Sequence, residues 1–189
     1  MGDVDGKRVL FAGCGDALEC LPFVKMGAVV SGVDVSESQI MLARKNCPIG
    51  AFSVQDFEKT SFKNNSFDFI VSILAIMYKK DLKKTFKEFR RILKKGGHIL
   101  LVVPHPLRKM LKYRLSTYFT RGFHWEHWRG TRRFNYYRLF EDYVNAFAES
   151  NLKLERLFEP KPVKEKPDTP AKETNHPHFA VFKLSLSKN

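Results

Sequence analysis

Apolar residues occur along this chain in short runs that predict the strands of a buried sheet. The runs are rich in β-branched and aromatic residues, as the strands of a covered parallel sheet are. The first run is followed by a glycine and the second by an aspartate. Seven runs occur, at residues 8–12, 28–33, 50–54, 67–74, 98–103, 152–158 and 179–186. The last run alternates between apolar and polar residues, which predicts a half-exposed antiparallel strand at an edge of the sheet.

Apolar residues at helical spacing lie between these runs and predict the helices. The helical segments are residues 16–26, 36–45, 81–95 and 141–149. In the second helix we expect Met41 and Leu42 to face the core. In the fourth we expect Tyr143, Val144 and Phe147 to point inward.

The order of these signals predicts the fold class. Strands and helices alternate as far as residue 103, with Gly96-Gly97 expected to end the third helix. This alternation is typical of an α/β fold, here a Rossmann-like, doubly wound, seven-stranded, mostly parallel sheet with an antiparallel last strand. The 189 residues suit a single domain. Residues 160–177 are rich in proline and lysine, and we expect them to form a mobile loop.

The turn after the first strand carries the strongest ligand signal. Gly13-Cys14-Gly15 lets the backbone approach a ligand, and the helix that follows presents free N–H groups. Asp34 comes 19 residues after Gly15 at the end of the second strand, close to the spacing of an acid that binds a ribose diol. A dinucleotide site needs a third glycine where this chain has Leu18, so the turn favours a ligand without a pyrophosphate.

Several ordered motifs resemble the class I S-adenosylmethionine-dependent methyltransferases of the methyltransferase type 11, or UbiE-like, family. They are RVLFAGCGDA at the first strand, GVDVSESQIMLARKN, QDFEKTSFKNNSFDFIVSILAIMY, and DLKKTFKEFRRILKKGGHILLVVPHP. The resemblance covers residues 7–106 densely and returns more weakly towards the C-terminus. It implies an enzyme that binds S-adenosylmethionine, releases S-adenosylhomocysteine and methylates an acceptor. The acidic position of the first motif is Phe11, and its third glycine is Ala17.

The resemblance also implies a set of cofactor-binding residues. Asp34 would bind the ribose hydroxyls with Val35 on the adenine, Asp56 would accept from the adenine amino group, and Phe57 would donate its backbone N–H. As alternatives, Asp34 can be a turn residue and Asp56 a loop former. The full set is Ala12, Gly13, Cys14, Gly15, Asp34, Val35, Asp56, Phe57, Ile73 and Leu74.

Within one domain, 1–189, we distinguish three parts by their composition and by the resemblance. Residues 1–106 are the cofactor-binding half, and residues 107–140 form an aromatic and basic insert on the substrate side. Residues 141–189 contain the C-terminal helix and strands. The aromatic side chains of the insert either line an acceptor pocket or form a small satellite core, and its arginines can face an anionic substrate.

Few residues are candidates for the chemistry itself. Methyl transfer needs a base only where the acceptor atom carries a proton. Tyr78 follows the fourth strand, and His105 follows the fifth at the carboxyl edge of the sheet, so both are candidate catalytic residues. His124 and His127 are three residues apart and would share one face of a helix, but two histidines alone do not predict a metal site.

The charge distribution leaves a second class of acceptor open. The net charge is +13, and residues 79–114 hold 13 Lys and Arg against 2 acidic residues. A solvated helix face explains most of these charges, whereas an RNA methyltransferase or RNA-binding protein is the alternative. A third interpretation is a non-catalytic cofactor-binding module that acts with a protein partner or as a homodimer. It is motivated by Phe11 and by a first motif that begins at residue 8.

The remaining composition points to the cytoplasm. The chain has an odd number of cysteines, and their spacing is not that of a metal site. We therefore expect buried, reduced thiols at Cys14, Cys20 and Cys47. No apolar run is as long as the roughly 18–20 residues of a membrane span. We therefore expect a cytoplasmic protein that does not bind a membrane.

Overall fold

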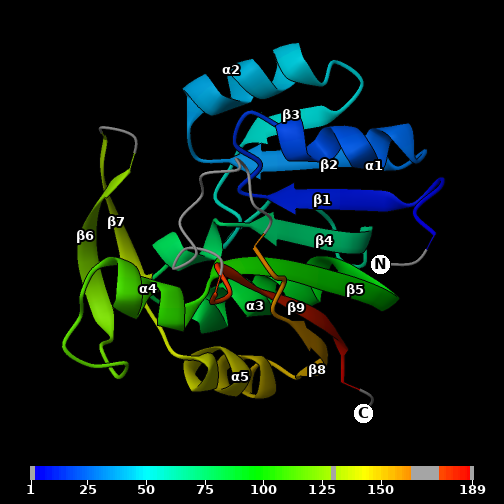
Figure 1. Cartoon of the computed structure of the whole chain (residues 1–189). Helices are drawn as coiled ribbons and strands as arrows, with labels where there is room; N and C mark the ends of the chain where they lie inside the picture. Colours follow the sequence, from blue (N-terminus) through cyan, green and yellow to red (C-terminus); the bar gives the residue numbers. More distant parts are fainter. Residues whose placement is uncertain (1–2, 129–130, 163–174, 188–189) are drawn as a thin grey trace.

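The computed structural model describes residues 3–128, 131–162 and 175–187. Figure 1 labels its helices and strands. The strands are β1 (Arg8–Ala12), β2 (Val29–Asp34), β3 (Ala51–Val54), β4 (Phe67–Ile73), β5 (Leu93–Pro104), β6 (Gly122–Trp128), β7 (Thr131–Tyr137), β8 (Leu152–Phe158) and β9 (Phe179–Leu186). The helices are η1 (Leu18–Cys20), α1 (Leu21–Lys25), α2 (Glu37–Asn46), η2 (Ile76–Tyr78), α3 (Leu82–Ile92), α4 (Pro106–Lys112) and α5 (Phe140–Glu149).

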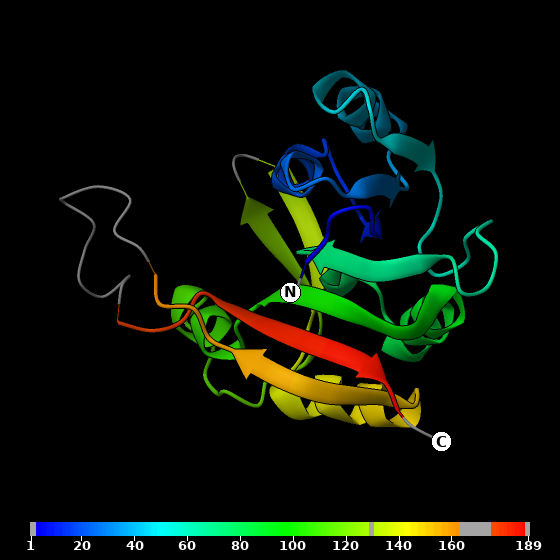
Figure 2. The same cartoon turned by 90° about the vertical axis from the view of Figure 1, so that its right-hand side faces the viewer.

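Seven strands form one sheet in the order β3-β2-β1-β4-β5-β9-β8, which confirms the predicted fold class. β1 to β5 pair in parallel, and β9 runs antiparallel to both of its neighbours. Our prediction that residues 179–186 form an edge strand was wrong, because β9 lies between β5 and β8 (Figure 2). Its alternating pattern reflects one better-covered face, and β8 is the edge strand.

Two hydrophobic cores lie on the two faces of the sheet. In β1, Leu10 belongs to the core under α3 and α5, whereas Val9 and Phe11 belong to the core under α1 and α2. Helices on both faces make the molecule a three-layer sandwich (Figures 1 and 2). The runs in the sequence are therefore apolar on successive residues because neighbouring positions face opposite cores.

Two helices bury a different face from the one we predicted. Met41 and Leu42 are 66% and 44% exposed, while Ile40 and Ala43 form the buried face of α2. In α5, Tyr143 and Phe147 point inward as predicted, but Val144 is exposed and Ala146 is buried instead. In short helices of mixed composition, the face that is buried depends on which one the neighbouring sheet covers.

The third helix ends earlier than predicted. α3 stops at Ile92, and Leu93 already pairs with Phe67 in the sheet. Gly96 and Gly97 are therefore not the stop signal of the helix, but lie in an irregular part of β5 where the register with β4 shifts.

The basic and aromatic insert contains a hairpin that the sequence pattern did not predict. β6 and β7 form a separate two-stranded sheet beside the main one (Figure 1). In a half-buried strand, apolar and polar residues alternate. Histidine and arginine interrupt this alternation in the hairpin, so the strand period could not be recognised in the sequence. His124 and His127 are in a strand, so the expected helical face is wrong and their side chains point to opposite sides.

Other expectations concern the chain as a whole. Cys14, Cys20 and Cys47 are buried, free thiols, as predicted. Burial is the main cause that raises the pKa of Cys14 to about 12. In the described ranges, no helix is long and apolar enough to cross a membrane. Most of the loop predicted at residues 160–177 lies outside the described residues.

Candidate functional site

The glycine turn after β1 contains two glycines with positive φ, one of them in close contact with a neighbouring residue. Gly13 has φ +75°, and a Cβ atom there would lie 2.3 Å from the Cβ of Ala75. Gly15 has φ +52°, a region that glycine adopts without the strain of a side chain. The backbone N–H groups of Gly13 and Cys14 both donate to the carbonyl oxygen of Val33, at 2.8 and 3.0 Å. The turn is thereby tied to the end of β2.

Asp34 links this turn to helix α2. Its carboxylate accepts from the backbone N–H groups of Gly15, at 3.0 Å, and Ser36, at 2.9 Å. Ser36 in turn caps α2 by accepting from the N–H of Gln39. Each carboxylate oxygen offers two lone pairs, so these bonds leave acceptor capacity for a ligand hydroxyl. Asp34 therefore does act as a turn residue, as the alternative prediction proposed, and this role is compatible with ligand binding.

A cavity of about 800 Å³ opens at the carboxyl ends of β1, β2 and β4; we call it the glycine-turn cavity. It lies where the strand order reverses, the usual ligand position in doubly wound sheets, and its size suits a cofactor. Eight of the ten predicted cofactor-binding residues line it: Gly13, Cys14, Gly15, Asp34, Val35, Phe57, Ile73 and Leu74. Phe11, in the position of the family's acidic residue, also lines it and packs edge-on against Phe23.

Ala12 and Asp56 are the two predicted residues that do not line this cavity. Ala12 is buried in the core beneath the turn. Asp56 is held by Lys79, whose Nζ lies 2.6 Å and 2.7 Å from its two carboxylate oxygens. Burial raises the pKa of Asp56, but hydrogen bonds from Lys79 and from the N–H of Glu58 outweigh it, so the pKa is lowered.

Lys79 is a site residue that sequence analysis missed. It lines the glycine-turn cavity, and its Nζ lies 4.9 Å from the ring centroid of Phe57 and 3.4 Å from Glu58. Nothing local marks Lys79, because it is 23 residues from Asp56 in a lysine-rich segment. The predicted contact between Asp56 and a ligand stays a prediction, and Lys79 would share that carboxylate.

The end of β4 joins this cavity to a second one. Leu74 has φ +53°, an uncommon conformation for a branched residue, and its N–H donates to Val102 at 2.9 Å. Such strained residues gather at functional sites. The second cavity has a volume of about 170 Å³ and lies between η2, α4 and the β6–β7 hairpin; we call it the hairpin cavity. Leu74, Tyr78 and Arg133 line both cavities.

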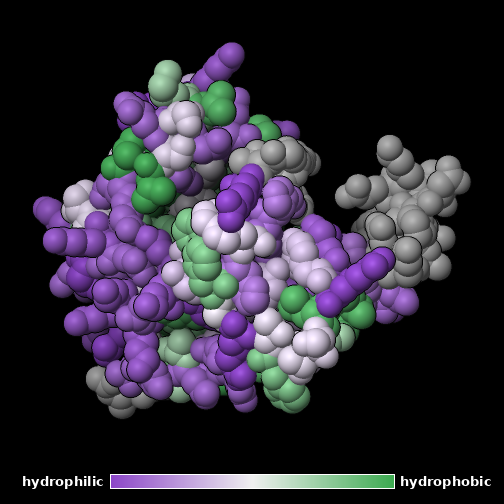
Figure 3. All heavy atoms as spheres, turned by 90° about the vertical axis from the view of Figure 1, so that its left-hand side faces the viewer, coloured by the Kyte–Doolittle hydropathy of each residue, from purple (hydrophilic) through white to green (hydrophobic). Residues whose placement is uncertain are grey.

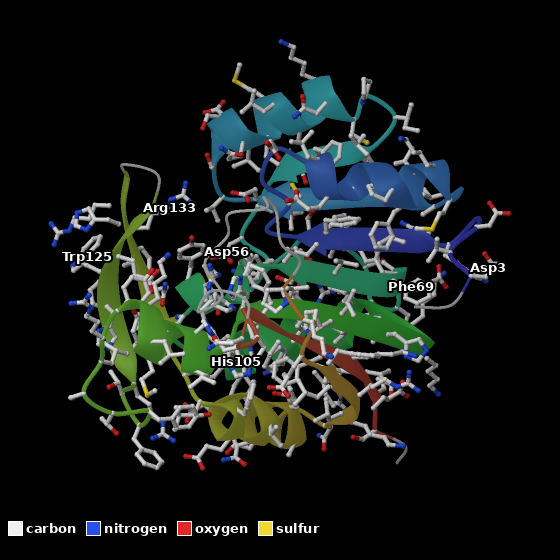
Figure 4. The ribbon with its side chains drawn as sticks, viewed as in Figure 1. Asp3, Asp56, Phe69, His105, Trp125 and Arg133 are labelled. Atoms are coloured by element: carbon white, nitrogen blue, oxygen red, sulfur yellow. The ribbon has the colours of Figure 1, made fainter. Side chains whose placement is uncertain are left out.

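The two candidate catalytic residues lie in different surroundings. Tyr78 is at the junction of the two cavities, with its ring edge-on to Phe134. His105 lines neither cavity and is buried. Its Nδ1 accepts from the N–H of Leu107 to cap α4, and its Nε2 lies 2.6 Å from Glu159. Figure 4 shows His105 on the side of the molecule near α5, away from Asp56 and Arg133. This geometry favours a structural role for His105.

The hairpin cavity has a polar wall that the sequence pattern did not reveal. α4 contributes Arg108 and Lys109, and the inner face of the hairpin contributes Glu126, Arg133 and Asn135. Figure 4 shows Arg133 pointing from β7 towards the body of the molecule, whereas Trp125 points away from it. The insert therefore contributes to a pocket through its polar residues and Tyr113, whereas Phe123, Trp125, Phe134 and Tyr136 pack on one another as a small aromatic cluster. In the described part of the chain, no group of His, Cys, Asp and Glu has the arrangement of a metal site.

Comparisons with known proteins agree with this geometry. The family model described as "Methyltransferase domain" matches residues 10–101. A malonyl-[acyl-carrier protein] O-methyltransferase from Erwinia pyrifoliae is 34% identical over 93 residues, which are 49% of this chain and 36% of that protein. A ubiquinone biosynthesis O-methyltransferase from Bradyrhizobium is 33% identical over 104 residues, 53% of this chain and 40% of that protein. The chain thus matches less than half the length of these curated relatives.

Solved structures share the fold over nearly the whole chain. An S-adenosylmethionine-dependent methyltransferase from Listeria monocytogenes superposes with a TM-score of 0.85 at 21% identity, covering 100% of this chain and 93% of that one. One from Mesorhizobium loti gives 0.76 at 22% identity, covering 97% and 93%. The match over residues 10–101, just under half of the chain, and the shared fold support a class I S-adenosylmethionine-dependent methyltransferase of the UbiE-like type.

Proposed function

We propose that this protein transfers the methyl group of S-adenosylmethionine to a small-molecule acceptor and releases S-adenosylhomocysteine. One observation carries the proposal: the glycine-turn cavity and the hairpin cavity meet at Leu74, Tyr78 and Arg133. A donor in the first cavity and an acceptor in the second would face each other at this junction, as an in-line displacement requires.

The residues of the glycine-turn cavity suit the cofactor. Gly13 and Gly15 line the cavity where its methionine part would lie, and Asp34 has acceptor capacity for two ribose hydroxyls. Val35 is 65% exposed and presents an apolar surface for the face of the adenine ring. The cofactor supplies an electrophilic methyl group when it is bound. The chain's part is to orient both molecules and to exclude water at Leu74 and Tyr78.

The names of the curated relatives support a small acceptor. They include proteins named for ubiquinone biosynthesis, demethylmenaquinone methylation and sterol 24-C-methylation. The hairpin cavity, with a volume of about 170 Å³, also suits a small molecule more than a polymer.

Ion pairs within the protein weaken the case for RNA. Lys79, Lys83, Arg91 and Lys94 each pair with a carboxylate, and Lys109 is buried. Three of the four carboxylates come from outside residues 79–114, so the charge excess along the sequence is partly neutralised in space. RNA binding by this region stays a prediction without an observation that favours it.

Calorimetric titration tests the proposal. We expect S-adenosylmethionine and S-adenosylhomocysteine to bind and NADH not to bind. Asp34→Ala should weaken binding of both by about tenfold or more, the effect of a lost charge-assisted hydrogen bond. Glu37→Ala is the matched control, because it removes an exposed carboxylate at the start of α2 that does not line the cavity. Circular dichroism of each variant checks folding. No binding by the wild-type chain would contradict the proposal.

A further inference from the structure

The polar wall of the hairpin cavity contains a buried ammonium group. The side chain of Lys109 is only 9% exposed, and its Nζ donates to Asn135 Oδ1 at 2.6 Å. It lies 4.0 Å from the ring centroid of Tyr137 and 3.9 Å from Glu126 Oε1. Burying a charge is unfavourable unless partners or a ligand compensate it. None of these residues belongs to the seven-stranded sheet, since all lie in α4 or in the β6–β7 hairpin.

Glu126 supplies an acceptor without a donor. Its side chain is 11% exposed, and Oε2 accepts from the hydroxyl of Tyr113 at 2.9 Å. Oε1 is buried, and no donor in the described residues forms a hydrogen bond with it. Glu126 lines the hairpin cavity. A buried carboxylate oxygen without a donor is unfavourable in the empty protein, and a ligand with a hydroxyl or amine would satisfy it.

The same wall carries an excess of positive charge. Three cationic side chains, Arg108, Lys109 and Arg133, line the cavity against one carboxylate, Glu126. Arg133 lies directly opposite Glu126 in the β6–β7 ladder, yet the two form no ion pair. Neither Arg108 nor Arg133 pairs with any carboxylate among residues 3–128, 131–162 and 175–187. A cleft of one charge sign concentrates small ions of the opposite sign.

Part of the lining is apolar. Leu74, Met77, Pro104 and Phe179 also line the cavity, so a ligand here needs an apolar body as well as polar groups. Seen from the hairpin side, the outer surface is mostly hydrophilic, and its apolar residues form separate patches (Figure 3). The cavity thus combines apolar residues with cations and a carboxylate.

We propose that the methyl acceptor is a small organic anion with an apolar body, bound in the hairpin cavity. Arg108 and Arg133 bind its anionic group, and Glu126 Oε1 accepts a hydrogen bond from its hydroxyl or amine. Lys109 supports both contacts, since it lies beside Glu126 and adds to the positive field. The role of this anion as the methyl acceptor rests on the proposed function, whereas its binding in the hairpin cavity does not.

Titrations with matched probes test the anion. Benzoate is compared with benzyl alcohol, and phenyl phosphate with phenol, each on the cofactor-free protein and on the protein loaded with S-adenosylhomocysteine. We expect at least one anion to bind about tenfold more tightly than its neutral partner. The stronger of benzoate and phenyl phosphate identifies a carboxylate or a phosphate as the preferred anion.

Two arginine variants show whether the cavity is the site. Arg133→Gln should weaken anion binding by about tenfold, while Arg132→Gln should leave it unchanged. Arg132 is the adjacent residue of β7, with the same charge, and it packs on Trp125 on the other face of the hairpin. Equal losses in both variants, or no binding of either anion at millimolar concentrations, would overturn the inference.

A third comparison tests Glu126. We expect 3- or 4-hydroxybenzoate to bind more tightly than benzoate, and this advantage should disappear in Glu126→Ala. Glu126→Gln, which keeps the shape of the side chain, should reduce it and serves if the alanine variant does not fold. An advantage unchanged in both variants would exclude Glu126 as the acceptor of the hydrogen bond. If the cofactor fails to bind while the anions bind as expected, the proposed function fails and the anion site stands.

Discussion

Substitution of Gly13 tests how tightly the glycine turn is built. Gly13→Ala places a methyl group 2.3 Å from the Cβ of Ala75 and keeps the backbone at φ +75°. The left-handed conformation costs an alanine about 1–2 kcal/mol. Overpacking against a fixed neighbour adds about 1–3 kcal/mol. We therefore expect the free energy of unfolding to fall by about 2–5 kcal/mol.

The chain offers a control that separates the two contributions. Gly96 has φ +76°, and a Cβ atom there would meet nothing within 4 Å. Gly96→Ala should therefore show the conformational contribution alone, about 1–2 kcal/mol. The difference between the two variants measures the contact with Ala75.

Urea unfolding, followed by circular dichroism, measures these free energies. Adding Ala75→Gly to Gly13→Ala removes the methyl group that the new side chain meets, so part of the lost stability should return. In the single variant, Ala75 and Leu74 must move to accommodate the added methyl group, and we expect cofactor affinity to fall with stability. If Gly13→Ala is no more destabilising than Gly96→Ala, the close approach that we describe is incorrect.

Two further predictions concern ionisable groups. Burial lowers the pKa of Lys109 from 10.5 to about 8, so the unfolded chain binds more protons between these values, and stability should rise with pH across that window. Lys109→Met should remove this rise in urea unfolding measured from pH 8 to 10.5, and an identical profile in the variant would contradict the assignment. The hydrogen bond from Lys79 helps to hold the pKa of Asp56 below its ordinary value of 3.8, which stabilises the protein above that pH and is lost as the pH falls through the lowered pKa. On acidification below pH 3.8, the Lys79→Met variant should lose less stability than the wild-type protein. If the wild-type protein loses no more than the variant, the stabilising ion pair is contradicted.

The sequence by itself determined the sheet and most of the predicted residues that line the glycine-turn cavity. Strands such as residues 8–12 and 67–74 are apolar on both faces, and this local property does not depend on distant residues. Gly13, Gly15 and Asp34 follow from turn chemistry and from the spacing of two consecutive strands. These residues converge because parallel strands bring their carboxyl ends to one edge.

Other features depended on which elements pack together. The sequence suggested Met41 and Leu42 for the buried face of α2, but the sheet covers Ile40 and Ala43. Gly96 and Gly97 resemble a helix stop, yet pairing with β4 already begins at Leu93. In both cases the local signal was ambiguous, and burial against a neighbouring element decided between the possibilities.

Only the tertiary structure decided which polar side chains meet at the two cavities. Asp56 and Lys79 are 23 residues apart, and Lys109 and Asn135 are 26 apart. Neither spacing corresponds to a helical or strand period, so no pattern in the sequence links these residues. Lys109 and Asn135 meet because the hairpin folds back over α4, and Asp56 and Lys79 meet because the segments after β3 and η2 lie side by side. The charges that the sequence collects in one basic stretch are then divided between ion pairs and a cavity wall. Long-range packing, rather than local chemistry, therefore determines which groups line the hairpin cavity.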